Sequence, residues 1–114
     1  MKIYNSTQNN LIADEVKVAK TFIKKTFGLI LRNDISEADG LIIKPCNSIH
    51  TFFMRFPIDV LFVDRKNKII ALHENVKPWR ILPIHFNSSY VIEIKSGQIS
   101  AKTISRHDII QIDE

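Results

Sequence analysis

The segment at residues 58–63, Ile-Asp-Val-Leu-Phe-Val, constrains the fold more than any other part of the sequence. In an extended strand, successive side chains point to opposite faces. The first, third and fifth residues are apolar and share one face, while Leu61 and Val63 share the other face with Asp59. A strand that is apolar on both faces needs cover on both sides, so it belongs inside the fold. The sequence therefore predicts a layered β structure that encloses an aspartate.

Other segments rich in β-branched and aromatic residues also have the pattern of strands. The polar residues 64–68 follow the central strand and suit the tip of a hairpin. Short strands about ten residues apart are typical of a β-sandwich or barrel, with mostly antiparallel pairing. Besides residues 58–63, we predict strands at residues 11–18, 41–43, 48–53, 69–72, 91–94, 99–104 and 109–112.

One helix is predicted near residues 19–28. Apolar residues recur there at four-residue spacing, at Ile23, Phe27 and Leu31, which is the pattern of a helix with one buried face. Gly28 is suited to end it, because glycine readily adopts the left-handed conformation of a helix terminus. The predicted fold class is thus mainly β: a compact sandwich or barrel with one short helix.

Composition narrows the class of protein. A chain of 114 residues, 45% hydrophobic and 25% charged, suits one globular domain spanning residues 1–114 and argues against disorder. No apolar run approaches the roughly 20 residues of a membrane-spanning helix, and the N-terminus has no apolar signal core. A single cysteine excludes an internal disulfide. We therefore expect a cytoplasmic protein with no membrane span, and a monomer or weak homodimer.

Cys46 and His50 are the first candidate site residues. They lie four apart, but on an extended strand that separation spans roughly 13 Å, too far for one metal ion. The other three histidines lack ligand spacing, so we expect no metal and no cofactor. Cys46 with His50 and Asp59 also supplies the residue types of a nucleophilic hydrolase, although such types recur in most chains of this size. A small buried thiol and a hydrogen-bonded histidine explain the same residues without catalysis.

Asp59 and Arg55 form the second candidate. An aspartate on an otherwise apolar face must be paired or accept hydrogen bonds, because its burial would otherwise cost several kcal/mol. Arg55, His50 and the amides near Pro57 are the candidate partners. The arrangement is explained either by a structural anchor or by an electropositive pocket in which Arg55 and Arg80 face a ligand.

Trp79 and Arg80 are the third candidate. They follow Lys77-Pro78, and they place the only tryptophan of the chain beside a cation. Tryptophan and arginine are enriched at recognition surfaces, although such a loop can equally be a lid over a β core. The lysines are scattered rather than arranged in a stripe with interleaved aromatics, which argues against a nucleic-acid partner.

With these residues in hand, the chain resembles the domain-of-unknown-function 192 family over residues 21–112. The matching elements occur in the family's order: Gly28-Leu29, Pro45-Cys46, Ile49–Met54, Pro57–Asp64, Pro78–Arg80, Val91–Ile94, Gly97 and Asp108. The resemblance implies a compact, mostly β domain of bacterial or archaeal type with no established reaction. It also implies that Met54, Asp59 and Glu93 occupy positions that the family usually fills this way. The family's closing turn reads Gly-Asp, whereas this chain has His107-Asp108.

The sequence therefore predicts a small binding or accessory module rather than an enzyme. The alternative is a small hydrolase that uses Asp59 or Cys46 with His50. The expected partner is a small anionic or sugar-like ligand, or another protein. Its candidate binding residues are Cys46, His50, Arg55, Asp59, Trp79 and Arg80.

Overall fold

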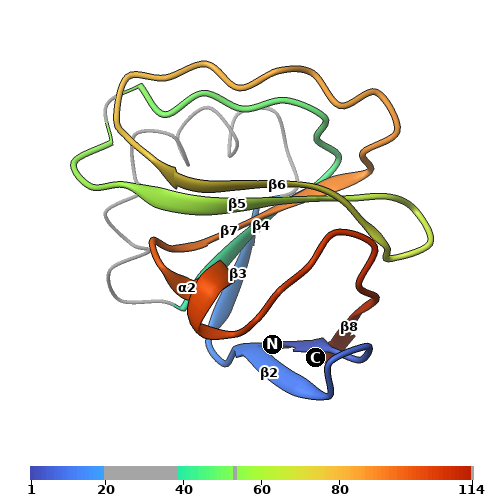
Figure 1. Cartoon of the computed structure of the whole chain (residues 1–114). Coiled ribbons are helices and arrows are strands. Elements are labelled where there is room, and N and C mark those ends of the chain that lie inside the picture. Colours follow the sequence, from blue (N-terminus) through green and yellow to red (C-terminus); the bar gives the residue numbers. More distant parts are fainter. Residues whose placement is uncertain (20–38, 53, 114) are drawn as a thin grey trace.

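The structure, a computed structural model, describes residues 1–19, 39–52 and 54–113. These residues form two β-sheets, one of five strands and one of three, which lie one above the other in Figure 1. The predicted mainly β class is confirmed. The sheets stay open and do not close into a barrel, so the layered alternative is the correct one. The predicted helix near residues 19–28 lies outside the described residues.

The larger sheet has the strand order β3-β4-β7-β5-β6. All of its neighbouring pairs are antiparallel except β3 with β4, which are parallel. Every residue of β5 is buried, which confirms that this strand has cover on both faces. The five strands are β3 (Val16–Ala19), β4 (Gly40–Ile43), β5 (Ile58–Val63), β6 (Ile69–Val76) and β7 (Tyr90–Lys95).

The smaller sheet covers one face of the larger one. It consists of β1 (Lys2–Asn5), β2 (Asn10–Ala13) and β8 (Ile110–Asp113), in the order β2-β1-β8. Its side chains Ile3 and Ile12 share a hydrophobic cluster with Leu61 and Val63 of β5. This cluster is one of two cores, and Asp59 lies on the same face of β5.

The second core lies on the opposite face of the larger sheet. Two connections cover that face, residues 44–57 between β4 and β5 and residues 77–89 between β6 and β7. Ile49 and Leu82 from these connections pack with Val60 and Phe62 of β5. In Figure 1 both connections run along the top of the molecule. This face therefore combines irregular backbone with a packed core, and it carries most of the candidate residues.

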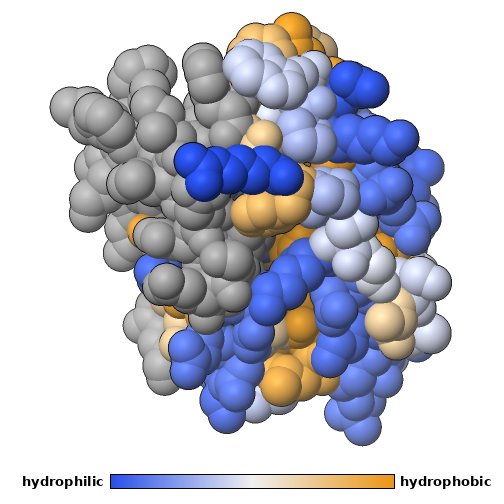
Figure 2. Space-filling model, turned by 90° about the vertical axis from the view of Figure 1, so that its left-hand side faces the viewer, coloured by the Kyte–Doolittle hydropathy of each residue, from blue (hydrophilic) through white to orange (hydrophobic). Residues whose placement is uncertain are grey.

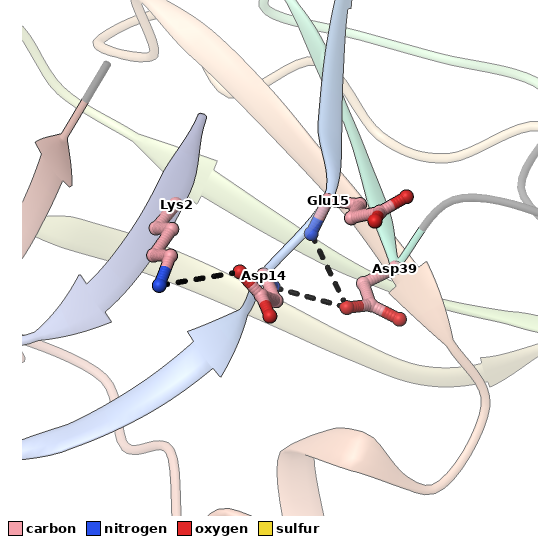
Figure 3. A network of polar contacts seen from close by, with 4 residues as sticks. All are labelled: Lys2, Asp14, Glu15 and Asp39. Atoms are coloured by element: carbon pink, nitrogen blue, oxygen red, sulfur yellow. Dashed lines mark hydrogen bonds and ion pairs between the residues drawn. The ribbon is translucent and has the colours of Figure 1, made fainter.

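A polar joint forms where the chain passes from the smaller sheet to the larger one (Figure 3). Asp39 Oδ2, next to the start of β4, accepts the backbone N–H groups of Asp14 and Glu15 at 3.1 and 3.2 Å. Lys2 of β1 pairs with Asp14 across 3.6 Å. The predicted strand at residues 11–18 is therefore interrupted at Asp14 and Glu15. It forms two strands, β2 and β3, which belong to different sheets.

Two predicted strands were wrong. Within the described residues 48–52, strand pairing is limited to an isolated bridge from His50 to Ile81, because the backbone groups there mostly bond to an irregular connection. Residues 99–104 form the short helix α2 (Gln98–Ala101) and a turn. In a strand, Ile99 and Ile104 would point to opposite faces because they are five apart. The helical turn instead places both in one core.

The hairpin and the strands around it were predicted correctly. β5 pairs with β6 around the polar tip at residues 64–68, and β6 continues to Val76, four residues beyond the predicted end. β4, β7 and β8 match their predicted segments closely. Within the described part of the chain, no helix is long and apolar enough to cross a bilayer.

Candidate functional site

The candidate surface is built from two segments that pair through their backbones. One is the Cys46–Arg55 loop, and the other is residues 79–86, here called the strap. Because neither segment belongs to a sheet, these mutual hydrogen bonds satisfy backbone groups that would otherwise lack partners. The bonds run from Thr51 N to Arg80 O at 2.8 Å, from Leu82 N to Ile49 O at 3.0 Å and from His85 N to Asn47 O at 2.8 Å.

Thr51 fixes the start of the strap. Its side chain is fully buried, and its hydroxyl donates to the carbonyl of Lys77 at 2.7 Å and accepts the N–H of Arg80 at 2.8 Å. Its carbonyl accepts the N–H of Trp79 at 3.0 Å. Trp79 has a φ of 65°, which is rare for a residue other than glycine. The three Thr51 bonds hold the tryptophan in this conformation and so fix where its side chain emerges.

Three rings lie in contact across the two segments. The centroids of His50 and Phe52 are 4.6 Å apart, and those of Phe52 and Trp79 are 5.6 Å apart, both within the range of attractive aromatic pairs. Trp79 is 57% exposed, and Arg55 and Arg80 are exposed on the same two segments. Five of the six predicted site residues thus lie on these two paired segments: Cys46, His50 and Arg55 on the loop, and Trp79 and Arg80 on the strap.

Cys46 and His50 make local hydrogen bonds within the loop. The Cys46 thiol donates to the carbonyl of Ser48 across 3.0 Å. His50 Nδ1 accepts the N–H of Phe52 at 3.3 Å, so its Nδ1 lone pair is directed at the backbone. Within the described ranges, no group of three or more His, Cys, Asp or Glu side chains is arranged to hold a metal ion.

Asp59 lies on the other face of β5, away from the loop and strap. It is fully buried, and its two oxygens accept the N–H groups of Asn75 at 2.8 Å and of Ile99 at 2.9 Å. The expectation that Asp59 pairs with Arg55 was therefore wrong, whereas the structural-anchor interpretation fits. This one carboxylate connects β5 to β6, at the point where their pairing is irregular, and to the first turn of α2.

Glu93 is a second fully buried acid, and it lies in β7. Its cross-strand neighbours are Leu41 and Val60, so it is on the face of the larger sheet that the loop and strap cover. The family resemblance singled out this position in the sequence. The alternation of apolar and polar residues does not indicate which face Glu93 is on, because the residues of β7 from Tyr90 to Ile94 are apolar apart from Glu93 itself. The register of the sheet is what places this carboxylate below the candidate surface.

The sequence of the chain matches an uncharacterized protein family. A family model described as "Uncharacterized ACR" matches residues 3–112, almost the whole chain. The chain belongs to the domain-of-unknown-function 192 family. A UPF0127 protein of Thermococcus gammatolerans is 31% identical over 115 residues, which cover 97% of this chain and 74% of that protein. One from Pyrococcus abyssi is 35% identical over 97 residues, covering 80% of each.

Solved structures share the fold of this family member. A protein of unknown function from Novosphingobium aromaticivorans superposes with a TM-score of 0.83 at 19% identity, over 98% of this chain and 84% of that one. A protein from Sinorhizobium meliloti gives a TM-score of 0.76 at 20% identity, over 96% and 89%. At these identities the likeness establishes the fold alone.

This DUF192 chain also contains a histidine pair that no pattern in the sequence indicates. His73 of β6 and His85 of the strap meet with their Nε2 atoms 2.9 Å apart, and both rings contact Phe62. The two ring centroids are 5.2 Å apart, which is the Nε2 separation plus about one ring radius on each side. The two Nε2 atoms therefore point directly at each other. One neutral ring donates and the other accepts. Twelve residues separate them, and only the path of the strap brings them together.

Ionisation of this pair is shifted by its surroundings. Burial lowers the pKa of His73, and the nearby His85 lowers it further. Burial also lowers the pKa of His85. Both effects favour the neutral rings that share a hydrogen bond. The pair therefore connects the strap to the sheet at neutral pH.

A hollow among the described residues lies elsewhere on the molecule. It opens on the smaller sheet, between β1, β2 and β8, and polar side chains such as Asn5, Asn10 and Gln111 line it. The candidate surface of the loop and strap is on the opposite side of the larger sheet. The two features are therefore separate.

Proposed function

We propose that this domain is a binding module whose recognition surface is the Cys46–Arg55 loop together with the strap, and whose partner is anionic. The observation that carries the proposal is the exposed Trp79, positioned by Thr51 and backed by Phe52. Arg80 follows it in the strap, and Arg55 is exposed on the paired loop. A rigid aromatic side chain loses little entropy on binding, and arginine presents a planar fork of donors that fits carboxylates and phosphates.

The hydrogen bonding of the catalytic candidates favours binding over hydrolysis. The Cys46 thiol donates a hydrogen bond to the carbonyl of Ser48, which is a structural use of the thiol. Both oxygens of Asp59 are occupied by backbone amides on the other face of the sheet. These groups hold the fold in place. The loop and strap, by contrast, present aromatic and cationic side chains outward.

Ligand binding is tested through the fluorescence of Trp79 and the melting temperature of the protein. A panel of inorganic phosphate, nucleotides, uronic acids and neutral sugars is titrated, because any ligand that binds only the folded state raises the melting temperature. We expect anionic compounds to raise it and to change Trp79 emission, and neutral sugars to do neither.

Charge variants locate the site. Arg80→Gln is expected to weaken binding by about tenfold, the effect of losing one charge-assisted hydrogen bond. Arg65→Gln is the matched control, because Arg65 is an exposed arginine at the tip of the β5–β6 hairpin. Equal weakening by both variants would indicate nonspecific charge attraction and contradict the proposed surface.

A further inference from the structure

The strap carries four large apolar side chains that point into solvent. Trp79 is 57% exposed, Ile81 74%, Ile84 53% and Phe86 83%. Figure 1 places the connection between β6 and β7 along the top of the molecule, and Figure 2 shows hydrophobic residues gathered at that upper edge. Soluble monomers rarely expose a contiguous apolar patch without a use for it, and such patches mark protein or membrane interaction sites.

The strap cannot turn these side chains inward. Leu82, between two of them in sequence, is only 8% exposed and packs in the second core. His85, also between two of them, lies against the ring of Phe62 at a centroid distance of 4.3 Å and bonds to His73. Because Leu82 and His85 point into the molecule and their backbone groups are bonded to the loop, their neighbours must point out.

The two segments that pair through the loop and the strap also lack acidic residues. No aspartate or glutamate occurs in residues 40–58 or in residues 75–92, the segments that form this face. They carry four exposed cations, Lys44, Arg55, Lys77 and Arg80. The remaining twelve cations of the chain balance its twelve acids, so the whole net charge of +4 arises from these two segments.

We propose that the strap docks the protein on the surface of an anionic lipid bilayer. The exposed apolar side chains enter the boundary between headgroups and acyl chains, where tryptophan is especially favoured. The four cations bind the phosphates of anionic headgroups, and long lysine and arginine side chains can reach them while their stems stay in apolar surroundings. This inference rests on the proposed function, because it names the anionic partner of the same surface.

The charge of the strap surface favours a bilayer over a second copy of the chain as its partner. A symmetric dimer through the strap would place like charges against each other, and such juxtaposition opposes association. An anionic bilayer meets both properties of these two segments at once, their exposed apolar side chains and their cations without acids. It also needs no pocket, and the hollow among the described residues lies on the smaller sheet instead.

The test uses the full chain with vesicles of phosphatidylcholine alone and of phosphatidylcholine mixed with phosphatidylglycerol. Because Trp79 is the only tryptophan, its emission reports directly on the strap. We expect a blue shift and co-sedimentation with the anionic vesicles. Salt should weaken this binding, since it screens exposed charges. Absence of binding to anionic vesicles, or equal binding to both kinds, would overturn the inference.

Variants separate the apolar and charged contributions. Phe86→Ser should weaken vesicle binding by at least roughly tenfold, and Lys77→Gln by about fivefold. Both side chains are exposed, so an unchanged melting temperature confirms folding. Ile109→Ser is the matched control, because Ile109 is exposed and lies beside β8 of the smaller sheet. Equal loss in this control would place the contact elsewhere and reject the strap.

Other outcomes distinguish the two proposals. If phosphate esters bind but anionic vesicles do not, the binding function stands and the membrane inference fails. If both are silent, both proposals fail. Sedimentation that shows a dimer abolished by Phe86→Ser would identify a second copy as the occupant and overturn the membrane inference.

Discussion

Asp59 shows how one buried side chain can hold three elements together. Its oxygens accept amides from β6 and α2, so the carboxylate replaces backbone partners that sheet and helix leave open. His107 shows the opposite case, a side chain on a strained backbone conformation. It has a φ of 78° in the turn that carries the buried Asp108, a conformation that glycine adopts without strain. Each residue leads to a stability prediction.

Replacing Asp59 with alanine should lower the free energy of unfolding by about 2 kcal/mol, because the N–H groups of Asn75 and Ile99 lose their acceptor. Urea denaturation of Asp59→Ala and of the wild type measures the difference. Asp64→Ala is the comparison, since the Asp64 carboxylate accepts two amides at the more exposed hairpin tip, where water can replace it. An equal loss for both variants would show that burial does not set the cost.

Replacing His107 with glycine should raise the free energy of unfolding by about 1 kcal/mol. A side chain in the left-handed region is strained by roughly this amount, and glycine relieves the strain. His107→Ala serves as the control, because alanine keeps the strain and should bring no gain. Thermal melts of the three proteins provide the comparison. A destabilised glycine variant would mean that the imidazole makes a contact worth more than the strain.

At the scale of elements, the strap is held by its neighbours rather than by a sheet. The Cys46–Arg55 loop supplies backbone partners, Thr51 fixes the conformation of Trp79, and His73 of β6 bonds to His85. Of these attachments, only the histidine pair titrates near neutral pH. The strap is therefore the element whose attachment should respond to acid.

Stability should fall as the pH drops below about 6.5, the ordinary pKa of histidine. The pKa values of His73 and His85 are lowered in the folded state, so the unfolded chain binds more protons in this range. Protonation then favours unfolding, and the contribution of the pair is lost as the pH falls through the folded-state pKa values. Urea denaturation between about pH 7.5 and pH 5, in the presence of a chelator, measures this dependence.

The variant His85→Gln should flatten this pH dependence, since only one of the two rings remains. His107→Asn is the control, because it removes an exposed histidine at a position whose positive φ asparagine tolerates. If both variants keep the wild-type slope between pH 7.5 and pH 5, the acid sensitivity comes from other groups.

At the scale of the whole molecule, the larger sheet separates two different surroundings. One face is covered by the regular strands of the smaller sheet, and it contains Asp59 in a structural role. The other face is covered by irregular connections that pack Ile49 and Leu82 inward while presenting aromatic and cationic side chains outward. A rigid sheet with variable connections on one side is a common way to position binding residues. The proposed partner surface and the structural anchor therefore lie on opposite faces.

Sequence by itself determined the elements whose pattern is local. The apolar alternation of residues 58–63, the polar hairpin tip and the strands at β4, β7 and β8 follow from side-chain period and turn chemistry. Local pattern also required that Asp59 be buried with partners. It misassigned residues 99–104, because their β-branched residues favour a strand, whereas a helical turn is what places both Ile99 and Ile104 in one core.

Only the tertiary structure decided which segments meet. The two amides on Asp59 come from β6 and α2, and Trp79 meets Phe52 from a segment 27 positions earlier. His73 meets His85 because the strap doubles back over β5 and β6. These contacts depend on the order of the strands and on how the two irregular connections pair. Both are set by residues far apart in the sequence. For this protein, local pattern specified the strands, whereas long-range packing assembled the surface that we propose it uses.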